Sequence, residues 1–196
     1  MKGVLFVLYI GFSCSCFAQE KGYELGYVVT ISNDTIKGLI KNRNSKIVFE
    51  DIKFKKDQKS KVETFTPRQL KSYKRLEAEY YSKRIDLDDG TGFKNHYFLE
   101  QKIKGDYLCY YEFDILLGTG NNAYYGILEK PAEKSNVVWT QGVWSQSDFR
   151  KKVSSYLKDE LALSEKISNG TYKTKDIEEI VREYNELKSM NNSKTN

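Results

Sequence analysis

Histidine is nearly absent from this chain, because the 196 residues include a single one, His96. A metal centre built from several histidines is therefore excluded, and a Ser-His-Asp arrangement would depend on His96 alone. Proline is also scarce, with 2 residues, so collagen-like and proline-rich architectures are excluded. We expect His96 to be an ordinary surface residue of a strand.

Long apolar runs are missing after residue 18, and none approaches the roughly 18 residues that a membrane-spanning helix needs. The segment before this point has the form of an export signal. Lys2 supplies a positive charge, residues 4–12 are apolar, and small residues lead up to Ala18. We therefore predict that residues 1–18 are a signal peptide, removed after Ala18.

Cysteine is limited to 3 residues, and removal of the signal leaves Cys109 alone. An exported protein with one cysteine has no internal disulfide, which suits a bacterial periplasm better than an animal extracellular space. Lipoprotein processing at Cys14 or Cys16 is a second alternative, although neither has a lipobox leucine three residues before it. Cys109 lies in an apolar stretch and is predicted to be a buried, inert thiol.

Aromatic residues are plentiful, with 15 Tyr, and apolar residues alternate with polar ones through the first two thirds of the chain. This alternation is typical of half-buried strands. We predict a twisted antiparallel sheet of about 7–9 strands over residues 19–144, with hairpin turns at 33–34 and 104–106. The segment 68–84 is ambiguous, and we expect one turn of helix after Pro67 followed by a strand.

The first hairpin has a register that the pattern predicts. Alternate positions carry Tyr23, Leu25, Tyr27, Val29 and Ile31. A two-residue loop at 33–34 would place Ile31 opposite Ile36 and Tyr27 opposite Ile40. This face is then the one expected to be buried.

Helical spacing replaces alternation after residue 144. The last such stripe consists of Ile177, Ile180, Val181, Tyr184 and Leu187. We predict about three helices over residues 145–190, packed on the sheet, and a disordered tail over 191–196. The chain is thus expected to be an α+β protein.

Charge is distributed unevenly along the chain, whose formal net charge is +5. Residues 37–84 hold 15 Lys or Arg against 6 Asp or Glu, a net charge of +9, whereas residues 85–144 have a net charge of −4. Lys53 and Lys55 alternate with apolar residues and are predicted to point away from the core. The alternatives are a face neutralised by the acidic segment and a contact surface for an anionic partner. That contact surface would consist of Lys53, Lys55, Lys56, Lys59 and Lys61.

Three carboxylates lie close together in a glycine-containing segment, and they are Asp86, Asp88 and Asp89. Hard oxygen ligands of this kind suit Ca²⁺. The EF-hand pattern fails, however, because Thr91 occupies the glycine position and Tyr97 the position of the final glutamate. We favour a solvated loop, keep the three aspartates as a weak metal candidate, and expect no cofactor.

Two further patterns suggest chemistry. Glu77 and Glu79 share one face of a strand, as the acidic residues of a hydrolase would, but the neighbouring cations favour surface pairing. An aromatic surface that stacks on sugars would use Tyr80-Tyr81, Tyr110-Tyr111, Tyr124-Tyr125, Trp139 and Trp144. We favour cross-strand packing for these aromatic residues.

A resemblance to a known group of proteins rests on five short segments: Gly26 to Thr30, Asn33 to Ile40, Phe65 to Pro67, Gly105 to Leu108 and Glu183 to Asn185. The pattern resembles exported Bacteroidetes proteins of unknown function, and the N-terminal module of some proteins associated with an outer-membrane β-barrel. Many of these proteins carry a cysteine between their first two helices, where this chain has Asp159-Glu160. The resemblance implies a periplasmic or outer-membrane-associated module and supplies no catalytic residues.

These observations lead to an expected function. We expect an exported cell-envelope module of a Gram-negative bacterium, with a non-catalytic binding or interaction role. Its partner would be an anionic envelope lipid, a polysaccharide or an envelope protein, and export makes nucleic acid an unexpected partner. The alternatives are an envelope hydrolase that uses acidic residues and a carbohydrate-binding module with a Tyr/Trp surface.

Overall fold

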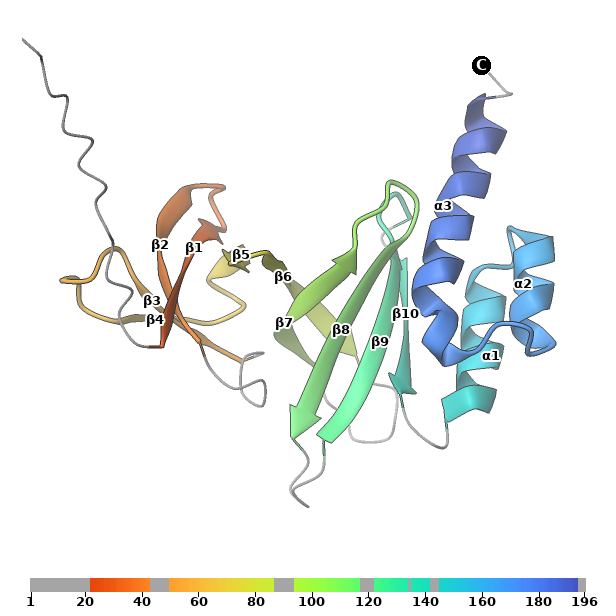
Figure 1. Ribbon diagram of the computed structural model, residues 1–196, viewed down its shortest axis with the longest axis horizontal. Coiled ribbons are helices and arrows are strands. Elements are labelled where there is room, and N and C mark those ends of the chain that lie inside the picture. The colour runs from red at the N-terminus through yellow and green to blue at the C-terminus, as the bar shows by residue number, and fades with distance from the viewer. Residues whose placement is uncertain are drawn as a thin grey trace, which may run out of the picture.

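The computed structural model describes residues 22–42, 50–86, 94–116, 122–133, 135–141 and 145–193. In these ranges ten antiparallel strands form one sheet, followed by three α-helices (Figure 1). The strands are β1 (Tyr23–Thr30), β2 (Thr35–Lys41), β3 (Ile52–Lys55), β4 (Glu63–Phe65), β5 (Leu70–Arg75), β6 (Ala78–Asp86), β7 (Lys94–Ile103), β8 (Cys109–Leu116), β9 (Asn122–Lys130) and β10 (Ser135–Gln141). The helices are α1 (Ser145–Tyr156), α2 (Leu161–Ser168), the short 3-10 helix η2 (Thr174–Asp176) and α3 (Ile177–Ser193).

The predicted α+β class is confirmed, with one strand more than the upper end of the predicted range. The strand order is β10-β9-β8-β7-β6-β5-β1-β2-β3-β4. Strands β5 to β10 therefore run as a simple meander, and the β1–β2 hairpin joins its edge with β3 and β4 beyond it. The helices lie at the β10 end and β1–β4 at the other end (Figure 1). Helix α3 continues to Ser193, past the expected start of the tail at residue 191.

The predicted register of the first hairpin is wrong by three residues. Val28 lies opposite Ile36, and the loop contains four residues rather than two. It is closed by a hydrogen bond from the Thr30 N–H to the Asp34 carbonyl at 2.9 Å, with Asn33 in the left-handed region at φ 72°. Val28 is fully buried on the inner face, whereas Ile31 is 57% exposed in the loop.

In the segment 68–84, a tight turn precedes the strands β5 and β6, closed by a hydrogen bond from the Gln69 N–H to the Thr66 carbonyl at 3.0 Å. The predicted order of a turn followed by a strand is therefore found, but the turn is not helical. The spacing of Leu70 and Tyr73 resembles helical spacing, and both residues are buried. A bulge between Val29 and Thr30 shifts the pairing of β1 with β5, so that residues three apart in β5 reach the same face. The three-residue spacing of Leu70 and Tyr73 is therefore explained by a bulged strand rather than a helix, and the pairing of β1 with β5 is needed to see this.

The first half of the sheet curls around a core on one of its faces, although the sheet as a whole stays open. Gly26 and Gly38 lie opposite each other on this inner face, and a Cβ at Gly38 would lie 2.5 Å from the Phe54 ring. The missing side chains let Phe54 cover the hairpin. The resulting core contains Val28, Ile40, Ile52, Phe54, Leu70, Tyr73, Tyr80 and Phe98.

The second half of the sheet, β6 to β9, curls towards the opposite face. Lys83 of β6 lies 2.7 Å from Glu129 of β9, measured from Nζ to Oε2, although two strands separate them. In a flat sheet this separation would be roughly 14 Å, because neighbouring strands lie about 4.8 Å apart. Cys109 is buried inside this curl, as predicted, with Ile85, Tyr97, Leu99, Tyr111, Phe113, Tyr125 and Ile127.

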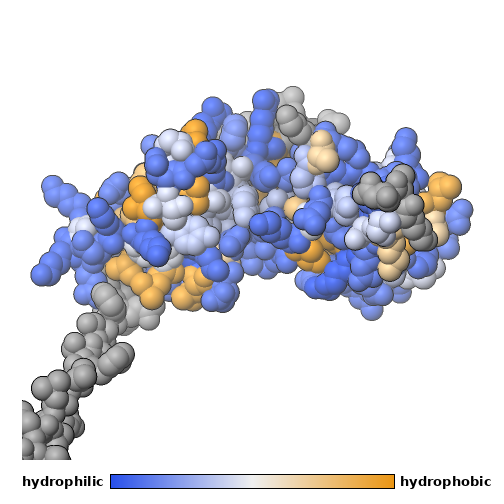
Figure 2. Space-filling model, turned by 90° about the horizontal axis from the view of Figure 1, so that it is seen from above, coloured by the Kyte–Doolittle hydropathy of each residue, from blue (hydrophilic) through white to orange (hydrophobic). Residues whose placement is uncertain are grey.

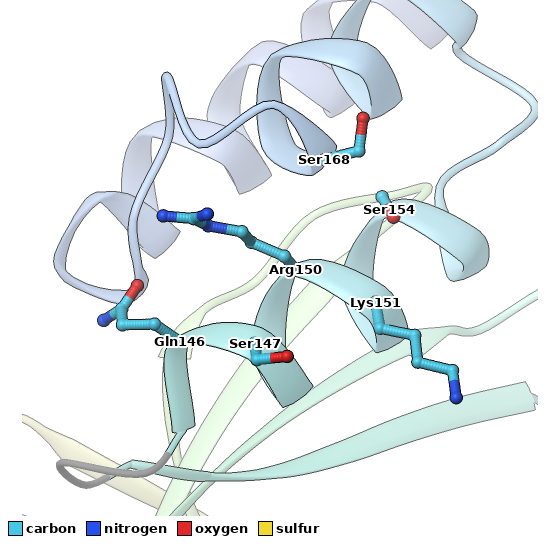
Figure 3. Close-up of a pocket in the computed structure, with 6 residues that line it drawn as sticks. All are labelled: Gln146, Ser147, Arg150, Lys151, Ser154 and Ser168. Atoms are coloured by element: carbon cyan, nitrogen blue, oxygen red, sulfur yellow. The ribbon is translucent and has the colours of Figure 1, made fainter.

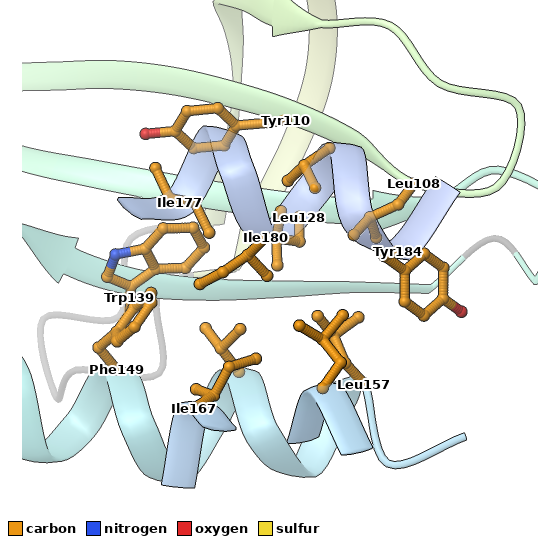
Figure 4. Close-up of a cluster of buried hydrophobic side chains, with 13 residues drawn as sticks. Leu108, Tyr110, Leu128, Trp139, Phe149, Leu157, Ile167, Ile177, Ile180 and Tyr184 are labelled. Atoms are coloured by element: carbon orange, nitrogen blue, oxygen red, sulfur yellow. The ribbon is translucent and has the colours of Figure 1, made fainter. Parts of the chain in front are cut away.

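The helices cover the outer face of β8, β9 and β10 (Figure 4). Trp139 of β10 is central, because its ring lies 5.6 Å from that of Phe149 in α1 and 6.0 Å from that of Tyr110 in β8. The predicted α3 stripe is confirmed as core: Ile177, Ile180, Val181 and Tyr184 are buried, and Leu187 packs partly buried against them. The helical region is therefore part of the folded unit.

Two of the motif segments meet in space. Asn185 of α3 accepts hydrogen bonds from the Tyr107 and Leu108 backbone N–H groups at 3.0 and 3.1 Å, and donates to the Leu108 carbonyl at 2.9 Å. Gly105 lets the hairpin approach, since a Cβ there would clash with the Asn185 amide. The hydrogen bonds between these segments hold α3 against the β7–β8 hairpin, so the role of both segments is to stabilise the fold.

Candidate functional site

The outer surface of β1, β2, β3 and β5 carries lysines at the positions that alternate with core residues. The register places Lys74, Tyr27 and Lys37 side by side across three strands. All three are at least partly exposed. We define the lysine face as Lys37, Lys41, Lys53, Lys55 and Lys74 on the strands, with Lys56, Lys59 and Lys61 in the β3–β4 turn.

The predicted orientation of the β3 lysines is confirmed. Ile52 and Phe54 are buried, with 3% and 1% of their surface exposed, and Lys53 and Lys55 alternate with them on the outer side. The Lys55 Nζ lies 5.1 Å from the centre of the Tyr23 ring. This cation–π contact holds the ammonium group at the surface without removing its charge.

The β3–β4 turn presents three exposed lysines. Asp57 shapes it by accepting hydrogen bonds from the backbone N–H groups of Lys59 and Ser60, each at 2.8 Å. Hydrogen bonds from the Ser60 side chain and the Lys59 backbone hold the pKa of the Asp57 carboxyl below its ordinary value. The carboxylate therefore organises the turn, while the lysines around it project into solvent.

In the part of the chain that the structure describes, few carboxylates lie close to the lysine face. Lys74 Nζ lies 3.7 Å from Glu77 Oε2, but the Glu77 side chain is 99% exposed, and such surface pairs contribute little. In the acidic segment, Glu100 and Glu112 instead lie near Lys102, at 2.7 and 3.7 Å. Among the described residues, no carboxylate lies within 4.0 Å of the side-chain nitrogen of Lys53, Lys56, Lys59 or Lys61.

Apolar side chains are interleaved with these lysines. Leu25 is 61% exposed and Leu76 52% exposed, and the two are adjacent because the Leu76 N–H donates to the Leu25 carbonyl at 3.0 Å. Leu25 also lies opposite Leu39, which in turn lies opposite Lys55. In Figure 2, apolar side chains gather among hydrophilic ones at the end of the molecule formed by β1–β4. The face is therefore both cationic and apolar.

The structure gives less support to the two acidic candidate sites, the aspartate cluster and the Glu77–Glu79 pair. Asp88, Asp89 and the Asp86 side chain lie outside the described residues, so the weak metal candidate stays a prediction. Within the described ranges, no group of three or more His, Cys, Asp or Glu side chains is placed to hold a metal ion. Glu79 accepts a hydrogen bond from the Tyr81 hydroxyl at 2.9 Å, and Glu77 lies in an exposed turn, so the two do not flank a cleft.

The proposed sugar-stacking aromatics are mostly core. Tyr80, Tyr110, Tyr111, Tyr125 and Trp139 are each at most 7% exposed, which confirms the cross-strand packing that we favoured. Tyr81 is half-buried, Tyr124 is 51% exposed, and Trp144 lies outside the described residues. A flat aromatic surface for a carbohydrate is therefore not formed by the described members of this set.

Sequence reasoning missed several members of the lysine face. The pairing of β1 with β2 and with β5 brings Lys37 and Lys74 to either side of Tyr27. The assumed two-residue loop placed Tyr27 and Leu25 on the buried face instead. One signal was available in the sequence. Pairing the two small residues, Gly26 with Gly38, predicts the correct register and places Lys37 opposite Tyr27.

Comparison with known proteins identifies no relative. No protein-family model matches the chain, and searches of curated proteins and of solved structures gave no match. Within the described ranges, no helix combines the length and apolar character needed to cross a membrane.

Proposed function

We propose that this protein is a non-catalytic binding module of the bacterial cell envelope that attaches to an anionic lipid surface through the lysine face. The observation that carries the proposal is the combination of strand lysines with exposed leucines on the surface opposite a buried core. The export signal and the resemblance to envelope proteins support the compartment, which remains part of the proposal.

Both components of the face suit a lipid surface. A lysine close to an anionic bilayer contributes roughly 1 kcal/mol, an attraction that salt screens over about 8 Å. Leu25 and Leu76 would enter the boundary between headgroups and acyl chains, where apolar side chains are favoured. An anionic polysaccharide would match the lysines but offers no apolar layer, so the leucines favour lipid.

Cosedimentation with vesicles tests the proposal. Wild type should sediment with vesicles that contain anionic phosphatidylglycerol, less at high salt, and not with neutral phosphatidylcholine vesicles. Reversing the charge of Lys53, Lys55 and Lys56 to Glu should abolish this binding. A matched control reverses three exposed lysines of the helical region: Lys158, Lys173 and Lys175. The control should sediment like wild type.

A second variant separates lipid from polysaccharide. The Leu25→Ser, Leu76→Ser double substitution should weaken vesicle binding while leaving the charge unchanged. If the lysine reversal sediments like wild type, the face is only solvated surface and the proposal fails. Binding to an anionic polysaccharide without binding to vesicles would also reject the lipid partner.

A further inference from the structure

A pocket of about 490 Å³ opens on the helical region, far from the lysine face (Figure 3). One face of α1 supplies most of its lining, because Ser147, Arg150 and Ser154 lie three or four residues apart. The end of α2 supplies Ser168 on the other side. The lining is completed by Gln146 and Lys151, and its described residues include no carboxylate.

Arg150 is held across this pocket. Its side chain extends from α1 towards the loop after α2, as Figure 3 shows, where a Cβ on Gly170 would lie 2.8 Å from its Cζ. Its Nε is buried, and no described residue accepts a hydrogen bond from it. A buried donor on a charged group is costly when it has no acceptor, but Nε is out of reach of solvent, so a partner in the pocket would meet the two terminal nitrogens of the guanidinium instead.

The end of α2 does not supply that partner. Its carbonyls at Glu165 and Ile167 already accept hydrogen bonds from the N–H groups of Asn169 and Gly170, at 3.0 and 3.2 Å. The neighbouring acid on α1, Asp148, is engaged by Lys152 at 2.9 Å. The guanidinium is thus presented to the pocket rather than used as a helix cap.

We propose that this pocket binds a phosphate group, either as free phosphate or as the monoester of a small molecule. The planar guanidinium of Arg150 offers two parallel N–H donors to a tetrahedral oxyanion, which is the geometry that favours arginine for such groups. The lining adds the hydroxyls of Ser147 and Ser154, whereas the Ser168 hydroxyl donates to the Glu165 carbonyl at 3.1 Å. Lys151 adds positive charge at the pocket margin.

Isothermal titration with sodium phosphate, at constant ionic strength set by sodium chloride, tests the site. Wild type should bind saturably, and Arg150→Gln should weaken binding by about tenfold or more, the effect of losing one charged hydrogen-bond donor pair. Lys152→Gln removes the same charge from the same helix outside the pocket lining and should leave the affinity within about twofold of wild type.

A second variant guards against a folding defect. Ser147→Asp introduces a carboxylate into the pocket in the first turn of α1, where an acid suits the helix dipole, so the melting temperature should hold while phosphate binding is lost. Glycerol 3-phosphate distinguishes the sources: tighter binding than phosphate indicates a monoester, and equal binding indicates the free anion. No saturable binding by wild type, or unchanged binding by Arg150→Gln, would overturn the proposal.

Discussion

Asp159 joins the helical region to β9 through a small charged network. Its Oδ1 lies 2.9 Å from the Nζ of Lys130, and its Oδ2 lies 2.7 Å from the Nζ of Lys188 and accepts a hydrogen bond from the Tyr184 hydroxyl at 2.7 Å. Lys130 is 6% exposed, so its charge depends on Asp159 and on the more distant and more exposed Glu133, whose Oε1 lies 3.6 Å from the Lys130 Nζ. Burial opposes ionisation of Asp159, but hydrogen bonds from Lys188, Lys130 and Tyr184 outweigh it and hold the pKa of the carboxyl well below its ordinary value.

Asp159→Asn should lower the free energy of unfolding by about 1–3 kcal/mol, because it leaves the Lys130 ammonium buried beside a neutral amide. Chemical denaturation at neutral pH measures this loss. Asp148→Asn is the matched control, since Asp148 pairs with Lys152 on the exposed face of α1. The control should change stability by less than about 0.5 kcal/mol.

The lowered pKa of Asp159 determines how the difference in unfolding free energy between wild type and Asp159→Asn depends on pH. Its stabilisation is complete above the unfolded-state pKa, near 3.9, and is lost as the pH falls towards the folded-state pKa. Wild type and Asp159→Asn should therefore differ by a constant amount from about pH 5 to 8 and converge below about pH 4. A difference that grows as the pH falls would contradict this role for the carboxylate.

At the scale of elements, the sequence predicted the strands and helices for which residue spacing and turn residues indicate the same structure. The β7–β8 hairpin was predictable because the turn residues Lys104-Gly105-Asp106 separate two runs of alternating apolar and polar residues. Helix α3 was predictable because five apolar residues recur along it at helical spacing. The β1–β2 register was not. Both faces of β1 carry apolar residues, such as Leu25 and Val28, so alternation alone does not select the buried face.

Part of the candidate site was predictable from the sequence and part was not. The outward direction of Lys53 and Lys55 follows from alternation within one strand and was predictable. The contribution of β1, β2 and β5 depends on pairing between strands, which the pattern did not determine. The pocket beside Arg150 was missed entirely, because Arg150 lies on α1 and Gly170 in the loop after α2, and the two carry no joint sequence signal.

The curl of the first half depends on the absence of a side chain at position 38. Gly38→Ala would place a Cβ against the Phe54 ring and the Lys55 carbonyl, both of which must shift. Overpacking of this kind costs about 1–3 kcal/mol, so the melting temperature should fall. Thr35→Ala, at an exposed position of the same strand, should leave it nearly unchanged. Equal melting temperatures for all three proteins would show that the close approach is not required.

At the scale of the whole molecule, charge and architecture are polarised together. The basic segment 37–84, with its net charge of +9, supplies most of β2 and β6 and all of β3, β4 and β5, whereas the helical segment 145–196 has 10 Lys or Arg against 9 Asp or Glu. Figure 1 shows these two parts at opposite ends of the sheet. An anionic surface would therefore attract one end of the molecule and leave the helices and their pocket facing away.

A polarity-sensitive dye placed on the lysine face tests this central claim most directly. A chain that begins at Gln19 retains only Cys109, which is 4% exposed, so a new cysteine at Leu25→Cys can be labelled selectively. Leu161→Cys, at a 73% exposed position of α2, is the matched control.

Our account predicts that anionic vesicles shift the dye emission at position 25 to shorter wavelength, that salt reverses the shift, and that the dye at position 161 does not respond. No shift at position 25, or equal shifts at both positions, would contradict attachment through the lysine face.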